Sequence, residues 1–187
     1  MKKVFQFLCY DFLLLICLIH PQIYCQLNEL TLEELCRNSS DIVRVRTIDI
    51  NSYYSGSEHN RIFSETTFLV MKSYKGDLLE NSTFKIKTLG GTVKGITMFA
   101  VGAVRFFNDE EAILFVSKLG ELDQKISYKL SSIFKGKFDI SNNSKFIRLG
   151  NNFEPFKINN SLGSINISSK DYFELTQFEN LITQLSK

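Results

Sequence analysis

The run Ala112-Ile113-Leu114-Phe115-Val116 decides how this chain folds. Its five side chains are all apolar, so neither face of the run suits water, and the isoleucine, phenylalanine and valine favour an extended backbone. Asn108-Asp109-Glu110-Glu111 precedes the run and predicts a turn that leads into it. We therefore expect a strand here that is buried on both faces and lies at the centre of the fold.

Three segments upstream of this run also have strand character, at residues 42–50, 61–74 and 84–88. In the first segment, Val43 and Val45 are in the opposite phase to Ile48 and Ile50. This change of phase predicts either a bulge or a strand that is buried on both faces.

The second and third segments have regularly alternating side chains. In the second, every other position from Thr66 to Val70 shares a face with Tyr74, and Lys75-Gly76-Asp77 ends the strand. In the third, Lys85 and Lys87 separate the apolar side chains, so we expect this strand to turn its lysine side to water.

Turn and loop signals connect the remaining segments. Gly90-Gly91 breaks the chain, and residues 92–104 predict one or two irregular strands. Three short strands are expected after the central run, at residues 126–130, 136–140 and 146–149. Residues 151–169 are rich in Asn, Ser and Gly, which predicts a long connection with one short strand at residues 165–167. Turns or bulges, with positive φ at one or more positions, are expected at Gly76, Gly90, Gly91 and Gly136.

A helix is predicted at each end of the mature chain. Thr31 and Glu34 form a capping-box pattern, which predicts a short helix from Leu32 to about Ser39. Ser168 and Asp171 repeat the pattern before an apolar stripe typical of an amphipathic helix. The stripe consists of Leu175, Phe178, Leu181, Ile182 and Leu185. Many short strands flanked by two helices predict a mainly β fold, a single antiparallel β-barrel or sandwich with a short N-terminal helix and an amphipathic C-terminal helix.

Residues 1–25 have the outline of a secretory signal peptide. Lys2-Lys3 precedes an apolar run of eight residues, 12–19, and cleavage is expected after Cys25. A helix of that length spans only about 12 Å, against about 30 Å for the hydrocarbon core of a membrane. We therefore expect a secreted, periplasmic or cell-surface protein whose mature barrel domain comprises residues 26–187. It would contact the membrane only if Cys25 carries lipid or the leader stays uncleaved.

The charge balance argues against a dedicated nucleic-acid surface, because 22 basic and 20 acidic residues leave a net charge of only +2. A local basic face near Tyr74 and Phe84 is an alternative. Its lysines would be Lys72, Lys75, Lys85, Lys87 and Lys94. Acidic glycans or anionic lipid headgroups suit such a face better than nucleic acid, because the leader directs the chain out of the cytoplasm. We expect no nucleic-acid partner.

The sequence lacks the common signatures of nucleotide, zinc and acyl-transfer chemistry. After cleavage one histidine, His59, and one cysteine, Cys36, remain, which leaves almost nothing for a transition-metal site or a Ser-His triad and no partner for an internal disulfide. Cys36 is interpreted as a small buried apolar side chain. We predict no catalytic, cofactor-binding or metal-binding residues and no cofactor. Asp109-Glu110-Glu111, the densest acidic cluster, is interpreted as a solvated turn, with a calcium site or an acid/base pair as alternatives.

Four short patterns follow one another in a characteristic order. They are Leu35 to Val43, Tyr74-Lys75-Gly76, Phe107 to Phe115 and Phe134 to Ile140, together with Leu89-Gly90-Gly91. This order resembles that of a group of uncharacterised small exported bacterial proteins, whose barrel is similar to the oligonucleotide-binding (OB) fold and to netrin-like domains, as in tissue inhibitors of metalloproteinases. The resemblance implies export and a β-barrel. The netrin-like comparison also implies protease inhibition through an N-terminal cysteine, whereas the expected N-terminus here is Gln26.

The sequence therefore predicts a non-enzymatic, exported β-barrel module that binds a protein or an envelope component. Its contacts are expected at the loop from Tyr53 to Asn60 and at the strand that carries Lys85 and Lys87. The alternatives are an inhibitor of extracellular proteases, a membrane-tethered lipoprotein, and a hydrolase that uses the carboxylates of residues 109–111.

Overall fold

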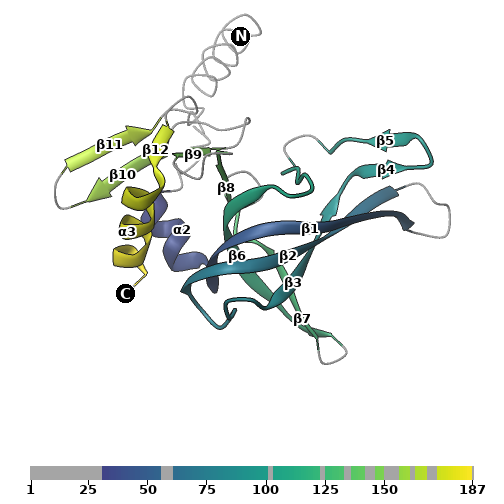
Figure 1. Cartoon of the computed structure of the whole chain (residues 1–187), viewed down its shortest axis with the longest axis horizontal. Coiled ribbons are helices and arrows are strands. Elements are labelled where there is room, and N and C mark those ends of the chain that lie inside the picture. Colours follow the sequence, from purple (N-terminus) through teal and green to yellow (C-terminus); the bar gives the residue numbers. More distant parts are fainter. Residues whose placement is uncertain are drawn as a thin grey trace, which may run out of the picture.

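The structure, a computed structural model, describes residues 31–55, 61–100, 103–122, 125–132, 136–141, 146–149, 156–160, 163–167 and 172–186. These residues form a mainly β fold with a closed five-stranded barrel and two helices (Figure 1). The predicted fold class is confirmed. The predicted signal peptide, residues 1–25, lies outside the described residues. Among the helices that the structure describes, none is long and apolar enough to cross a membrane.

Five strands make the barrel, in the order β1, β2, β3, β7 and β6, with β6 returning to β1. Their bounds are Asp41–Ser55 (β1), Arg61–Lys75 (β2), Thr83–Leu89 (β3), Glu111–Leu122 (β6) and Lys125–Leu130 (β7). Neighbouring strands pair antiparallel except β3 and β7, which pair parallel with Ile86 opposite Tyr128. The barrel closes where Val45 of β1 lies opposite Ala112 of β6.

The apolar run of β6 is the central strand that the sequence predicts. Ala112, Leu114 and Val116 point into the barrel, where they join its interior core, while Ile113 and Phe115 pack on the outside against the helices. All five side chains are at most 2% exposed. One edge of β6 pairs with β1, and the other is shared by β7 and by β8 (Lys137–Ile140).

Two helices cover the outer face of β6. Helix α2 (Leu32–Asn38) starts with the predicted capping box: Thr31 Oγ1 accepts from the Glu34 N–H at 3.2 Å, and Glu34 Oε2 accepts from the Thr31 N–H at 3.0 Å. Helix α3 (Leu175–Leu185) buries Leu175, Phe178 and Ile182 of its apolar stripe. Both helices join one outer core with residues of β1, β6 and β8.

The other elements extend the barrel in two directions. Strands β9 (Phe146–Leu149) and β12 (Tyr172–Glu174) continue the sheet from β8 and lead to α3. Two hairpins stand apart, β4 (Gly91–Val93) with β5 (Ile96–Met98), and β10 (Phe156–Asn160) with β11 (Gly163–Ile167). The helices and the β10–β11 hairpin lie on one side of the barrel, and the β4–β5 hairpin lies on the other (Figure 1).

Three predictions about local structure are corrected. Tyr53 to Ser55 belong to β1, paired with β2, so the predicted loop is shorter, and residues 56–60 lie outside the described part. The connection at 151–169 contains the β10–β11 hairpin rather than one short strand, because its Asn- and Ser-rich segments pair with each other. Helix α3 begins only at Leu175, because residues 172–174 before it pair as β12. Its cap, Glu174, makes no side-chain hydrogen bond, and the predicted capping residues 168 and 171 lie outside the described part.

A fourth correction concerns Tyr74, which does not share the face of Phe68 and Val70. It packs against the outer core, and its hydroxyl donates to Glu179 Oε1 at 2.6 Å. The pairing of β1 with β2 shifts register twice near this end, between Ile42/Val43 and Arg44/Val45. Each shift leaves one residue of β2, Met71 or Tyr74, without a partner on β1, and such an extra residue reverses the phase of the alternation.

Candidate functional site

The interior of the barrel changes character along β1, β2 and β3. At one level Val45 of β1 faces Val70 of β2. Two residues earlier in β2, Phe68 pairs with Phe84 of β3. At the far level, Ser64 lies opposite Ser52 on one side and Thr88 on the other. The barrel therefore has an apolar end and a hydroxyl end, the latter formed by Ser52, Ser64, Thr66 and Thr88.

A bulge in β1 creates the hydroxyl end. The register shifts between Thr47 and Asp49, so Ile48 is left without a partner in the ladder and is 48% exposed. Val43, Val45 and Thr47 are buried before this point, whereas Ile50 and Ser52 line the interior after it. The predicted change of phase is thus a bulge, which turns the even-numbered side chains of β1 inward.

The serine and threonine hydroxyls of this end are partly satisfied by one another. Ser52 Oγ lies 2.8 Å from Ser64 Oγ, and Ser64 Oγ donates to the Gly90 carbonyl at 2.8 Å. Thr66 differs from them, because its side chain is buried, at 1% exposure of the residue, and its Oγ1 has no hydrogen-bond partner among the described residues. Burying an unpaired hydroxyl costs about 1–3 kcal/mol, so this atom is an unusual feature of the interior.

Gly90-Gly91 lets the chain pass close to these serines and enter the β4–β5 hairpin. Gly91 has φ +137°, and a Cβ atom there would overlap the Oγ atoms of Ser52 and Ser64. Gly90 has φ +106°, and its Cβ would lie 2.9 Å from the Met98 carbonyl oxygen. Positive φ at Gly76, Gly90 and Gly91 confirms the prediction of special backbone at these glycines.

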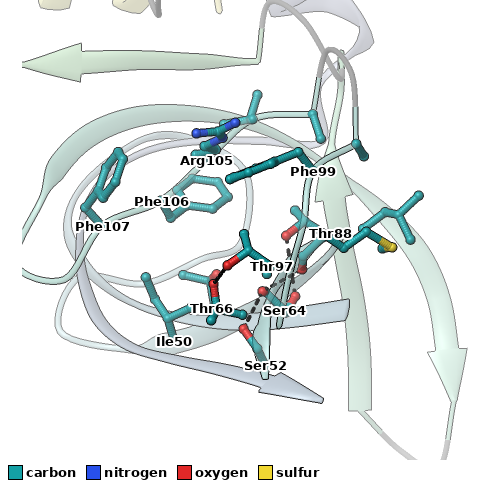
Figure 2. A pocket seen from close by; sticks show the side chains of 18 residues that line it. Ile50, Ser52, Ser64, Thr66, Thr88, Thr97, Phe99, Arg105, Phe106 and Phe107 are labelled. Atoms are coloured by element: carbon teal, nitrogen blue, oxygen red, sulfur yellow. Dashed lines mark hydrogen bonds between the residues drawn. The ribbon is translucent and has the colours of Figure 1, made fainter. Parts of the chain in front are cut away.

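An aromatic wall faces the hydroxyls from the segment that precedes β6. Phe106 packs edge-on against Phe68 with ring centroids 4.8 Å apart, and so separates the hydroxyl end from the apolar core. The Arg105 guanidinium lies 4.2 Å above the ring of Phe99. Phe99 and Phe107 are 63% and 62% exposed and form the rim. Figure 2 shows this wall on one side, with Ser52, Ser64, Thr66 and Thr97 across from it.

Together these elements enclose a pocket of about 340 Å³. Its hydroxyl-bearing residues are Ser52, Ser64, Thr66, Thr88, Thr92 and Thr97. Its apolar side chains come from Ile50, Leu89, Met98, Ala100, Ala103, Val104 and the three phenylalanines. The volume lies near the lower end of the range for small-molecule sites, about 300–1,000 Å³.

A buried ion cluster at β8 holds the aromatic wall in place. Lys137 of β8, 4% exposed, donates to the Arg105 carbonyl at 2.9 Å and to Glu110 Oε1 at 2.8 Å, and lies 2.7 Å from Asp139 Oδ1. Its ammonium group is 5.2 Å from the centre of the Phe106 ring. Burial raises the pKa of Glu110 even though Lys137 opposes the shift. The wall is therefore anchored to β8 by paired charges.

The acidic cluster Asp109-Glu110-Glu111 does not act as a unit. Glu110 pairs with Lys137, while Glu111 accepts from Arg44 at 2.6 Å and from Arg46 at 2.7 Å. Asp109 is exposed in the turn with φ +61°. None of the three lines the pocket. The interpretation as a solvated turn holds for Asp109, whereas the two glutamates lie in ion pairs with residues far away in the sequence. No group of three or more His, Cys, Asp or Glu side chains that could hold a metal ion occurs in the described part of the chain.

The five lysines do not form one basic face. Lys72 pairs with Glu179, and Lys75 donates to the carbonyls of Cys36 and Ser39 near the helices. Lys85 pairs with Glu65, and Lys87 lies over the rings of Phe63 and Tyr53. Lys94 is in the turn of the β4–β5 hairpin. Phe84 is buried inside the barrel rather than lying beside them.

Cys36 is fully buried in the outer core, as the sequence predicts. Burial raises the pKa of its thiol to about 11, so it is a poor nucleophile and a poor metal ligand at neutral pH. His59 lies outside the described residues. Sequence reasoning placed Thr66 on a strand face and missed the pocket, because the other hydroxyls belong to strands that meet only in the fold.

Comparison with family models, curated proteins and solved structures found no match. The pocket is therefore interpreted from its geometry.

Proposed function

We propose that this protein is an exported, non-enzymatic binding module that holds a protein or an envelope component at the hydroxyl end of its barrel. The observation that carries the proposal is the buried Oγ1 of Thr66, which lacks a partner among the described residues and belongs to a residue that lines the pocket. Most buried polar atoms in natural folds have a hydrogen-bond partner, so an unpaired one beside a pocket supports a ligand that supplies the partner.

The barrel topology supports an OB-like or netrin-like module. Five strands close through the pairing of β1 with β6, and β3 and β7 form the parallel pair. Five-stranded Greek-key barrels commonly bind ligands over one face and the adjoining loops. The hydroxyl end has this arrangement, because the β4–β5 hairpin and the aromatic wall extend from the strand ends.

The chemistry of the pocket supports binding rather than turnover. Its described polar side chains are hydroxyls and the Arg105 guanidinium. General acid–base catalysis needs a group that changes protonation near the working pH. The exposed rings of Phe99 and Phe107 instead offer apolar contact area to a bound surface.

The first experiment concerns export. The protein is recovered from its native cell envelope and its N-terminal sequence and intact mass are measured. A start at Gln26 without added mass supports a soluble exported module, and lipid on Cys25 supports a membrane-tethered lipoprotein. A full-length chain in the cytoplasm with residues 1–25 intact would overturn export.

The second experiment concerns the site. The protein purified from the exported fraction is mixed with isolated envelopes and sedimented, beside the double variant Phe99→Ala/Phe107→Ala. Both rings are largely exposed, so the variant should fold. We expect the wild type to sediment with the envelopes and the variant to stay in solution. Leu79→Ala, a change at another largely exposed apolar side chain outside the pocket, is the control and should behave like the wild type. Equal sedimentation of the double variant would overturn the assignment of the site.

A further inference from the structure

We infer that the pocket binds a neutral pyranose ring, either as a free sugar or as the end of a glycan chain. This inference rests on the proposed function and specifies the chemistry of the ligand. It depends on four properties of the pocket: the type of its polar groups, the unpaired Thr66 hydroxyl, the opposite aromatic wall, and the distribution of charge.

The polar groups match a ligand that carries hydroxyls. Each serine or threonine hydroxyl both donates and accepts, as do the hydroxyl groups of a sugar. Ser52 and Ser64 already bond to each other, as do Thr92 and Thr97 at 2.9 Å across the hairpin, so each pair presents oriented oxygen atoms with remaining capacity. A carboxylate or phosphate only accepts hydrogen bonds and is held most strongly by charged donors such as arginine and lysine.

Thr66 supplies the most directional contact. Its residue is 1% exposed and lies between Ile50 of β1 and Ile86 of β3, which cannot hydrogen-bond to it through their side chains. Among the described residues nothing satisfies its Oγ1. A small shift of the neighbouring side chains would open this buried atom to the pocket, and a ligand hydroxyl paired with it would remove the penalty of its burial. An alkyl chain in the same place would leave it unpaired.

The aromatic wall suits the apolar face of a sugar ring. The C–H groups on one face of a pyranose carry partial positive charge, and the faces of aromatic rings are negative. Phe99, Phe106 and Phe107 lie across from the hydroxyls, so a ring held between them would meet polar groups at its edge and phenyl rings at its face (Figure 2). The Arg105 guanidinium over Phe99 adds donors at the rim.

The charge and the volume of the pocket restrict the class of ligand further. Arg105 is the only ionisable residue among the described residues that line the pocket, and it is exposed at the mouth. An anionic ligand would find one cation rather than the clusters that bind phosphates. A volume of about 340 Å³ suits one or two rings and not an extended peptide.

The test is a titration of the full exported protein, followed by NMR and calorimetry. The probes are the methyl pyranosides of glucose, galactose, mannose and N-acetylglucosamine and the neutral disaccharides that end in them. We expect saturable binding of at least one sugar. Tighter binding of the disaccharide than of its methyl pyranoside indicates a glycan end, and equal binding indicates a free sugar; both support the inference.

Variants locate the binding. Thr66→Val keeps the shape of the side chain and removes the hydroxyl, and should weaken binding about tenfold without lowering the melting temperature. Thr66→Ser should retain most of the affinity. Phe99→Ala should weaken binding severalfold, while Thr83→Val, an exposed change on β3 outside the pocket, should have no effect. Sugar binding that Thr66→Val and Phe99→Ala leave unchanged would overturn the inference.

The outcomes also separate this inference from the proposed function. If the wild type sediments with envelopes but binds no sugar, or binds only inorganic phosphate or a neutral peptide, the ligand class is wrong and the binding module stands. If it neither sediments with envelopes nor binds any sugar, both proposals fail.

Discussion

Strands β1, β2 and β3 contribute to both ends of the barrel interior, but the side chains that they place there differ. At the apolar end, Phe68 and Val70 of β2 are fully buried and belong to a cluster of apolar side chains. At the hydroxyl end, the next inward positions of the same strand are Thr66 and Ser64, which lie under a pocket. The apolar side chains that stabilise the barrel are therefore concentrated at one end, while the other end carries the pocket and a buried unpaired hydroxyl.

Replacing Phe68 by alanine should have the largest effect, because it damages the apolar end directly. Its ring is fully buried and contacts Phe84 at 5.3 Å and Phe106 at 4.8 Å between centroids. Phe→Ala substitutions in cores typically cost about 3–5 kcal/mol. Urea unfolding should show this loss, and Phe68→Leu should show a clearly smaller one. A loss below about 1 kcal/mol would mean that the apolar end does not hold the barrel together.

Gly91→Ala should have the second largest effect, at the hydroxyl end. The new Cβ would collide with Ser52 and Ser64 in a backbone of φ +137°, so both strain and overlap contribute, about 2–4 kcal/mol together. Gly95→Ala is the matched control, because Gly95 has φ +81° but no atom within 4 Å of its Cβ position. It should cost only about 1 kcal/mol of strain. Thermal unfolding measures the loss of stability in both variants. Equal losses would show that the overlap of the new Cβ with Ser52 and Ser64 is unimportant.

The sequence predicts the apolar end far better than the hydroxyl end. The run from Ala112 to Val116 is apolar at every position, so its burial on both faces follows from composition. The capping box of α2 is equally local, because Thr31 and Glu34 satisfy each other.

The pocket depends on long-range geometry that local patterns do not contain. Ser52 points inward only because the bulge at Ile48 changes the phase of β1, and it meets Ser64 only through strand pairing. Threonine is also a common strand residue, so Thr66 carries no distinctive signal. For the same reason the ion-pair partners of Glu110 and Glu111 were not predictable, since they come from β8 and β1.

Lowering the pH should weaken the ion pairs around the apolar end more than the contacts at the hydroxyl end. Around the apolar end, Glu179 of α3 bonds to Lys72 and Tyr74 of β2, and Glu111 bonds to Arg44 and Arg46. Burial alone would raise the pKa of each glutamate, but these hydrogen bonds and cations outweigh it and lower both pKa values below the usual 4.5.

A lowered pKa in the folded state means that the unfolded chain binds more protons below about pH 4.5, so stability falls as the pH drops through that range. Glu110 contributes with the opposite sign because burial raises its pKa. Glu179→Gln should therefore lower stability by about 1–2 kcal/mol at pH 7 and reduce the difference between pH 7 and pH 3. Denaturant titrations at the two pH values measure both quantities, and an unchanged pH dependence would show that Glu179 does not tie α3 to the barrel.

Thr66→Val should have the smallest effect on stability and the only favourable one. Valine has nearly the same shape, so packing between Ile50 and Ile86 should be kept, while the unpaired hydroxyl is removed. We expect a gain of about 1 kcal/mol in the free energy of unfolding, measured in urea. Thr66→Ser keeps the hydroxyl, removes a methyl group and should be slightly destabilised, which separates the polar contribution from packing. A loss on Thr66→Val would mean that the Oγ1 is satisfied in solution. A gain would show that the hydroxyl end keeps a costly group that the fold alone does not need, which is the expected property of a binding site.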